Sequence, residues 1–293
     1  MTGIVLCERM HQRLVTALIL CSASIASLSA AETRRDREVN ANGLGKVEAY
    51  EPIYAIVEPH HRVTEGDDAY TNIKFQLSLA YPMVEFGDAH GDDPRKDGFF
   101  LSYTQTSFWD MHAESKPFYD TSYKPEGWFR LGCKPLLGTS SNSIEFGFAH
   151  ESNGRDGEAS RTINRWFLRT NARWELGPDW YVLAHPRFSA YRNDVDNPLM
   201  SEYRGYVDLL VDVGQENGAK LALLGRIGDT GEYGCLQADL SWPLNRTWPL
   251  YKWFSDFNGY VYFQTFIGYS ETLLDYTARA DIPRFGIGYA LVR

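Results

Sequence analysis

Apolar and polar side chains alternate with a period of two over most of the chain beyond residue 50, which is the pattern of strands with one apolar and one polar face. Between Phe285 and Leu291 the odd positions hold Phe, Ile, Tyr and Leu, whereas the even positions hold Gly, Gly and Ala. Residues 207–212 are a second clear case: Leu209 shares one face with Val207 and Val211, and Asp208 and Asp212 lie on the other face. No sustained helical period is found, so the pattern predicts an all-β fold.

About twelve such segments, separated by Gly, Asp, Asn and Pro, follow one another without a linker. Even numbers of antiparallel strands are typical of closed bacterial outer-membrane barrels, in which an open strand edge would be unsatisfied. We therefore expect a twelve-stranded antiparallel transmembrane β-barrel over residues 49–293, and a soluble secreted β-sandwich is the alternative. The strand centres are expected near residues 54, 78, 104, 130, 147, 168, 185, 209, 224, 238, 264 and 287.

The aromatic content fits the membrane interpretation. The chain contains 18 Tyr and 8 Trp, enough for the aromatic girdles that mark both membrane interfaces. Four tryptophans lie near the expected strand ends and are candidates for these girdles. They are Trp109, Trp128, Trp180 and Trp242.

The N-terminal segment has the composition of an export signal. Arg9 and Arg13 precede an apolar run, and a stretch of small residues ends at Ala31. This layout predicts a secretory signal peptide over residues 1–31, because the apolar run is too short to span a bilayer. The charged residues 32–48 are expected to form an N-terminal tail.

Charge and hydropathy argue against two classes of protein, and the cysteine positions argue against a disulfide. A net charge of -9 argues against a nucleic-acid partner, which would need clustered Lys and Arg. A mean hydropathy of -0.37 is too polar for a bundle of membrane helices. Beyond the signal only Cys133 and Cys235 remain, and strand parity places them on opposite faces of the wall, so we expect two unpaired thiols.

Candidate chemistry lies at the end of one predicted strand. Parity places His150 and Ser152 on the same face as Phe146 and Phe148, so the pair extends an apolar stripe that would face lipid. A serine hydroxyl becomes a nucleophile when a base takes its proton, and His is the usual base near neutral pH. Two residues apart on one strand face, the side chains are separated by about 6 to 7 Å at their Cα atoms, which rotamers can close.

The next predicted strand and the intervening loop add two more features. Asn164 shares parity with Trp166, so it can lie beside His150 and fix the orientation of the imidazole, the role that Asp has in common serine hydrolases. Residues 153–160 form a loop rich in turn formers and oxygen donors. Because Ca²⁺ prefers oxygen ligands, this loop is a candidate metal site beside the nucleophile.

The string from His150 to Arg155, followed by Asn164-Arg165, resembles the active-site segment of the outer membrane phospholipase A family. The resemblance implies calcium-dependent hydrolysis of the acyl esters of glycerophospholipids (phospholipase A1/A2 and lysophospholipase activity) in the outer membrane, by a homodimer with a Ser-His-Asn triad. Supporting similarity lies in 74–80, 102–105 and 268–276.

The resemblance also implies roles for single residues. Ser152 would be the nucleophile, His150 the general base and Asn164 its orienting partner, and the backbone amides of Ser152 and Gly154 would hold the oxyanion. Further implied sites are the calcium ligands Arg155 and Ser160, through their carbonyls, with Ser115 from the partner chain, and the dimer-interface residue Gln105.

Two other functions compete with this prediction. A porin or other non-catalytic barrel needs only the alternation and the export signal, but gives no reason for His150, Ser152 and Asn164 to share one outer face. A soluble esterase would instead bury the apolar faces between two sheets. On sequence alone, Gln105 also fits a polar position inside a barrel. The stretch 245–257 is longer than a tight periplasmic turn, and no function is assigned to it.

Overall fold

The computed structural model describes residues 47–60, 70–86, 96–192, 197–246 and 259–293. The predicted signal peptide, nearly all of the predicted tail and most of the stretch 245–257 lie outside these residues. The chain divides into two compact units. One comprises residues 45–243 and 260–293 and contains every strand. Of the other, the structure describes the 3-10 helix η3 (Leu244–Arg246) and Gly259.

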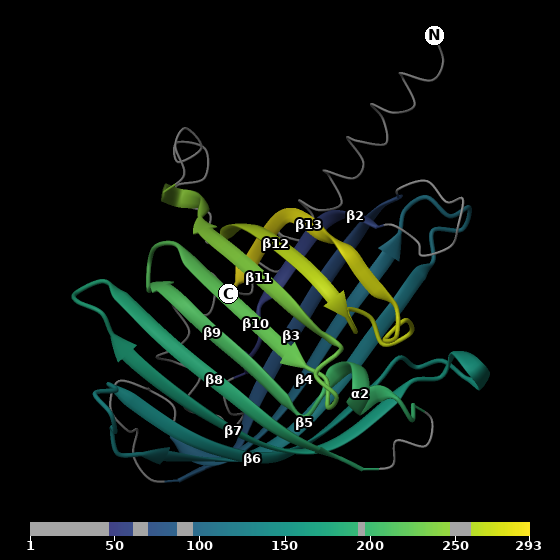
Figure 1. The fold of residues 1–293 in the computed structure, drawn as a ribbon. Helices are drawn as coiled ribbons and strands as arrows, with labels where there is room; N and C mark the ends of the chain where they lie inside the picture. The colour runs from purple at the N-terminus through teal and green to yellow at the C-terminus, as the bar shows by residue number, and fades with distance from the viewer. Residues whose placement is uncertain (1–46, 61–69, 87–95, 193–196, 247–258) are drawn as a thin grey trace. The chain divides into compact units, whose positions relative to one another are not determined.

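The strand-bearing unit is one antiparallel sheet in which β2 to β13 pair in chain order and β13 pairs back to β2, which closes a barrel (Figure 1). Two short helices, η2 (Gly157–Ala159) and α2 (Met200–Arg204), lie in its loops. Among the residues that the structure describes, no helix has the length and apolar character needed to cross a bilayer. The strands are β1 (Glu48–Ala49), β2 (Ile53–His60), β3 (Tyr70–Phe86), β4 (Asp97–Asp110), β5 (Phe118–Cys133), β6 (Ser141–Ser152), β7 (Thr162–Glu175), β8 (Trp180–Tyr191), β9 (Val207–Gln215), β10 (Lys220–Ile227), β11 (Gly234–Pro243), β12 (Tyr260–Tyr269) and β13 (Arg279–Val292).

The short strand β1 lies in line with β2 along the same edge of β3, so it does not add a thirteenth strand to the barrel wall. Both pair with β3, Glu48 opposite Ala80 and Tyr54 opposite Gln76, so they follow one another along the same edge. Each of the twelve expected strand centres falls in a different strand from β2 to β13. The predicted all-β, twelve-stranded antiparallel barrel is therefore confirmed.

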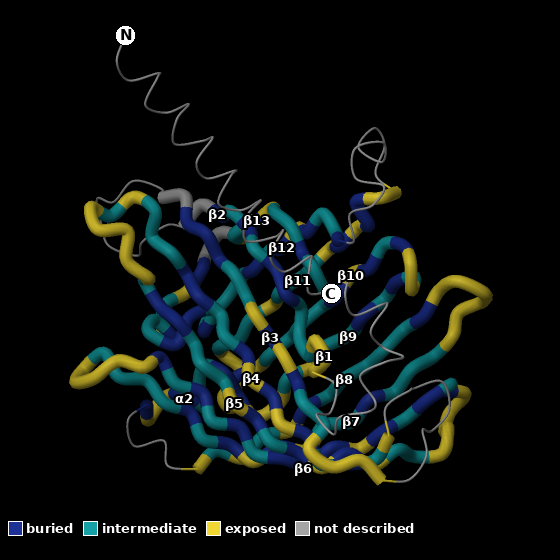
Figure 2. The backbone as a smooth tube through the Cα atoms, turned by 180° about the vertical axis from the view of Figure 1, so that it is seen from behind, coloured by how far each residue is buried: buried dark blue, intermediate teal, exposed yellow. Residues whose placement is uncertain are grey.

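The two faces of the wall are polarised in the opposite sense to those of a water-soluble domain. On β9, Leu209 is 46% exposed on the outside, whereas Asp212 is buried inside. On β13, Ile287 is 60% exposed. Figure 2 shows buried and exposed residues alternating along the strands. A soluble sandwich would bury its apolar faces, so that alternative is wrong.

The barrel interior is filled by ion pairs and aromatic rings. Arg187 lies 2.8 Å from Glu126, and Arg169 pairs with Glu145, all from different strands. Buried charges require such partners, because an unpaired charge away from water is costly.

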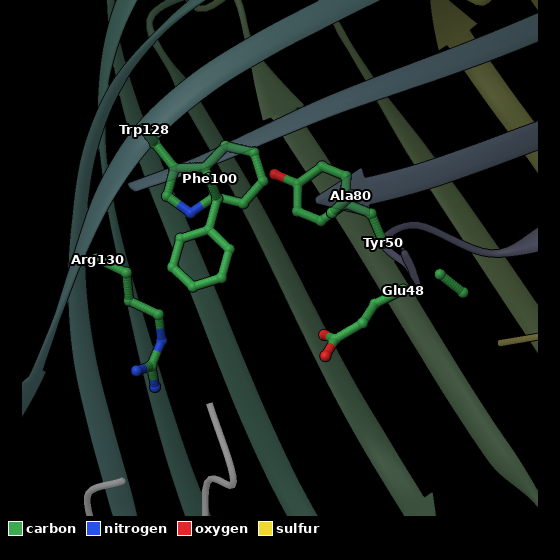
Figure 3. Close-up of a pocket in the computed structure, with 7 residues that line it drawn as sticks. Glu48, Tyr50, Ala80, Phe100, Trp128 and Arg130 are labelled. Atoms are coloured by element: carbon green, nitrogen blue, oxygen red, sulfur yellow. The ribbon is translucent and has the colours of Figure 1, made fainter. Parts of the chain in front are cut away.

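Towards one end of the barrel, Trp128 stacks on Tyr50 and Phe100, beside a cavity of about 250 Å³ (Figure 3). The expectation that Trp128 joins an outer girdle is therefore wrong, because its even position on β5 points inward with Arg130 and Glu126. Trp180 and Trp242 are 44% and 48% exposed, as girdle residues should be. Cys133 and Cys235 are both free thiols, as expected.

Candidate active site

Three side chains on two neighbouring strands form a chain of hydrogen bonds on the outer wall. His150 lies on β6 directly opposite Asn164 on β7, and Ser152 follows two residues later on β6. His150 Nδ1 is 2.8 Å from Asn164 Oδ1, and His150 Nε2 is 3.2 Å from Ser152 Oγ. The structure thus brings together the three residues that parity had placed on one face.

The local sequence explains why the group faces outward. On β6 the odd residues Glu145 and Glu151 are buried inside the barrel, which turns the even residues to the outside. Below His150 the same outer face carries Phe146, 52% exposed and stacked on Trp166 of β7. The triad therefore continues an apolar aromatic stripe.

The hydrogen-bond partners fix the tautomer of His150. Because Asn164 Oδ1 can only accept, the imidazole must donate from Nδ1, and Nε2 is then free to accept the proton of the Ser152 hydroxyl. This is the state in which a histidine can activate a serine nucleophile.

An apolar groove of about 530 Å³ reaches His150 along the wall. Gly127 of β5 has no side chain and lies between Leu101 of β4 and Phe148 of β6. A Cβ at position 127 would lie 3.1 Å from the Leu101 side chain, so glycine keeps this part of the groove open.

The loop after Ser152 is held by its own side chains. Asn153 is buried; its Nδ2 donates to the carbonyl of Ala159 at 2.9 Å, and its Oδ1 accepts from the amide of Arg161 at 3.0 Å. Gly154 has φ +66°, and a Cβ there would lie 3.0 Å from the Tyr123 ring. A side chain at 154 would be both strained and crowded.

Asn153 and Tyr123 were not identified as site residues from the sequence. An Asn that immediately follows a strand and precedes Gly is a loop-closing signal that could have pointed to Asn153. Tyr123 could be found only from the pairing of β5 with β6, where it lies opposite Ser152.

The residues expected to bind calcium lie in two loops. Arg155 and Ser160 belong to the loop between β6 and β7, whereas Ser115 is exposed in the turn between β4 and β5. In the former loop, the carbonyls of Ser160 and Glu158 accept hydrogen bonds from Nη1 of Arg161 at 2.8 and 2.7 Å. Two carbonyl oxygens thus converge on a positive charge, which fits a hard cation. The described residues contain no cluster of three or more His, Cys, Asp or Glu, so carbonyl and hydroxyl oxygens would have to supply the ligands.

Gln105 lies on the outer face of β4 in line with the nucleophile. Gln105 pairs with Tyr123, and Tyr123 pairs with Ser152, so the three form one row across the strands. The side chain of Gln105 accepts from the hydroxyl of Tyr103, which is 39% exposed, and donates to Ser107, both at 3.1 Å. The alternative that Gln105 is an interior residue is therefore wrong.

Comparison with known proteins places this geometry in a family. The family model described as Phospholipase A1 matches residues 45–291, nearly the whole described barrel. This chain belongs to the phospholipase A1 family. The resemblance predicted from the residues around Ser152 is confirmed.

Two relatives within the family show the extent of the similarity. Phospholipase A1 of Escherichia coli (strain K12) is 32% identical over 228 residues, which cover 75% of this chain and 69% of the relative. Phospholipase A1 of Klebsiella pneumoniae is 32% identical over 222 residues, covering 75% and 70%.

Two solved structures match the fold. Outer membrane phospholipase A from Escherichia coli superimposes with a TM-score of 0.67 at 28% identity, covering 86% of this chain and 93% of that one. The Salmonella typhi outer membrane phospholipase, solved as a dimer with bound calcium, matches with a TM-score of 0.67 at 28% identity and covers 87% and 94%. The predictions of an outer-membrane barrel, and of a phospholipase rather than a non-catalytic porin, are confirmed.

Proposed function

We propose that this protein cleaves the acyl ester bonds of glycerophospholipids in the outer membrane, as a calcium-dependent homodimer with Ser152 as its nucleophile. The observation that carries the proposal is the hydrogen-bond chain from Asn164 through His150 to Ser152, half-buried on the outer face of the wall. On this wall, an acyl ester can reach the nucleophile without leaving the bilayer.

The geometry supports a two-step acyl transfer. Ser152 Oγ attacks the ester carbonyl while its proton passes to His150 Nε2, and the imidazolium then returns that proton to the departing alcohol oxygen. In the second step His150 takes a proton from water, which attacks the acyl-serine; the imidazolium then returns this proton to Ser152 Oγ as the bond to the acyl group breaks and the fatty acid leaves. Asn164 holds Nδ1–H throughout and adds no charge, whereas a carboxylate at this lipid-facing position would be costly to desolvate.

The oxyanion and the acyl chain each have a place in this proposal. The backbone amides of Ser152 and Gly154 would donate to the oxyanion, and the positive φ of Gly154 sets the direction of its peptide. The apolar groove that ends at His150 would take an acyl chain, because Phe99, Leu101 and Phe148 line it.

Calcium would be held by the carbonyls of Arg155 and Ser160 together with the partner subunit's Ser115. When bound, it would polarise the ester carbonyl and stabilise the negative charge that develops on its oxygen. The carbonyl of Ser160 first has to exchange its hydrogen bond from Arg161 for the cation.

The dimer would be formed by the outer face around Gln105. Leu77 pairs with Gln105, and Leu79 and Leu101 continue the exposed apolar surface on β3 and β4. A second copy seated there would cover the row that leads through Tyr123 to Ser152, so association would complete the substrate cleft.

Removal of calcium tests the metal and the dimer together. We expect excess chelator to lower fatty-acid release from mixed phospholipid–detergent micelles by about a hundredfold or more, because the cation that would stabilise the oxyanion beside the backbone amides is lost. Added Ca²⁺ should restore activity, and Mg²⁺ should restore less, because it gives up its water ligands reluctantly. Sedimentation in the same detergent should show the dimer fraction rising with Ca²⁺.

Two results would overturn parts of the proposal. Full activity in chelator would remove the calcium role. A folded protein that releases no fatty acid in saturating Ca²⁺ would remove the hydrolase assignment itself.

Asn164→Ala tests the orienting role. We expect kcat to fall by about 10-fold to 100-fold, because the lost hydrogen bond to the imidazole corresponds to about 1–3 kcal/mol. The matched control is Asn171→Ala, which removes an Asn–His hydrogen bond on the same strand, to His185 inside the barrel. Steady-state kinetics per folded molecule should separate the two variants, and equal losses would show that Asn164 only stabilises the fold.

A further inference from the structure

The residue between the two catalytic side chains on β6 is a buried acid. Glu151 points into the barrel, where it is 6% exposed. Its carboxylate accepts from the hydroxyl of Ser122 on β5 at 2.8 Å, and it lies 3.2 Å from the guanidinium of Arg204 and 3.7 Å from that of Arg165. One side chain thus contacts β5, β7 and α2 from the inside of the wall.

Arg165 is likewise the inward-facing neighbour of a triad residue, Asn164. It follows Asn164 on β7, points inward and is 2% exposed. The ion pair between Glu151 and Arg165 therefore joins, behind the wall, the same two strands whose outer faces carry His150, Ser152 and Asn164.

The pair is anchored further inside the barrel. Arg165 also lies 3.6 Å from Asp208 of β9, which binds Arg226 of β10 at 3.0 Å. Arg204 comes from α2, a loop helix whose Met200 is buried against Ile163 of β7. The inner contacts of Glu151 are thus part of a network that reaches from the catalytic strands to β9 and β10.

Because Glu151 lies between His150 and Ser152, its inner contacts affect how these two side chains are oriented on the outer face. Successive side chains of a strand point to opposite faces, so the two peptide groups that flank Glu151 also carry His150 and Ser152. Rotation of β6 about its own axis would move both catalytic side chains. The distance of 3.2 Å between His150 Nε2 and Ser152 Oγ is at the long end of the hydrogen-bond range, so a small rotation would break the contact.

We infer that Glu151 is a positioning residue for the triad: held by Arg165, Arg204 and Ser122 inside the barrel, it sets the angle at which β6 presents His150 to Ser152. The inference rests on the proposed function of the triad. In this inference, buried charges that do not contact the substrate affect the rate of catalysis.

The test compares Glu151→Gln with a matched interior variant, Asp212→Asn. Asp212 and Lys220 form a buried ion pair at 3.3 Å between β9 and β10, strands that carry no triad residue. Each variant exchanges a buried acid for its amide. We expect Glu151→Gln to lower kcat about 10-fold to 100-fold with KM changed by less than about twofold, as misorientation of reacting groups does. Asp212→Asn should leave both constants unchanged per folded molecule.

A second measurement follows the triad without phospholipid. The rate at which a small sulfonyl fluoride modifies Ser152 should fall in Glu151→Gln by the same factor as kcat. Glu151→Asp, which keeps the charge on a shorter side chain, should recover part of both rates. Heat-modifiable migration on gels gives the folded fraction for each variant.

The outcomes separate this inference from the proposed function. If Ser152 of the wild type does not react, the triad assignment fails and the positioning role fails with it. If the wild type reacts and Glu151→Gln reacts equally fast, only the positioning role is overturned. Equal losses in Glu151→Gln and Asp212→Asn would also overturn it, because they would report a general effect of interior charge.

Discussion

Ser152→Ala is expected to lower kcat by about 10⁴-fold to 10⁶-fold, the range found when the nucleophile of a serine hydrolase triad is removed. The methyl group cannot form the acyl intermediate, so only binding and the oxyanion donors remain. Because Ser152 lies on the outer wall and its side chain bonds only to His150 among the contacts described, the barrel should fold normally. Fatty-acid release from mixed micelles in saturating Ca²⁺ measures the loss.

The matched control is Ser143→Ala on the same strand. Ser143 is buried inside the barrel and accepts from Asn171 at 2.9 Å, so its loss affects the interior and leaves the outer face intact. We expect that variant to keep wild-type kcat per folded molecule. If Ser152→Ala retained more than about one per cent of wild-type activity, another nucleophile would have to be sought.

His150→Ala is expected to cause a loss of about the same size, because members of a triad act as a unit and their effects do not add. Among the described residues, His150 is the side chain hydrogen-bonded to Ser152 Oγ, so its loss removes the proton acceptor, and the hydroxyl is a poor nucleophile when protonated. The double variant of Ser152 and His150 should therefore be no worse than either single variant. The kcat values of the two single variants and of the double variant, each corrected for the folded fraction, make up a double-mutant cycle.

His185→Ala provides the comparison for this variant. His185 also bonds to an asparagine, Asn171, but on the inner side of β7 and β8. Its removal should leave kcat unchanged. A double variant whose loss equalled the product of the two single losses would mean that Ser152 and His150 act independently, contrary to the triad.

Most of the fold could be predicted because membrane barrels impose one simple rule on each strand. Alternation with a period of two located all twelve staves, since lipid and the polar interior demand opposite side chains at successive positions. The same rule explains why the expectation for Trp128 is wrong: nearness to a strand end favours a girdle residue, but Trp128 shares parity with the buried Arg130 and therefore points inward. The break between β1 and β2 falls at Tyr50-Glu51-Pro52, where the proline has no N–H to donate to the strand ladder.

The triad could be predicted for the same reason, whereas its support could be predicted only in part. His150, Ser152 and Asn164 lie on neighbouring strands joined by one loop, so parity alone gives them a common face. Parity also places Arg165 inside the barrel on the strand next to Glu151, so that partner could be predicted. Arg204 could not, because it lies 53 residues away in the loop helix α2, and strand parity gives no position for a loop residue.

The alternation of faces along β6 restricts which insertions and deletions this enzyme can tolerate during evolution. Inserting or deleting one residue upstream in the strand would turn His150 and Ser152 into the lumen and expose Glu151 to lipid. A change of two residues would restore the faces but move His150 away from Asn164, its partner across the strand pair. Heritable length variation in this lineage should therefore accumulate in loops, while the catalytic staves change only by substitution.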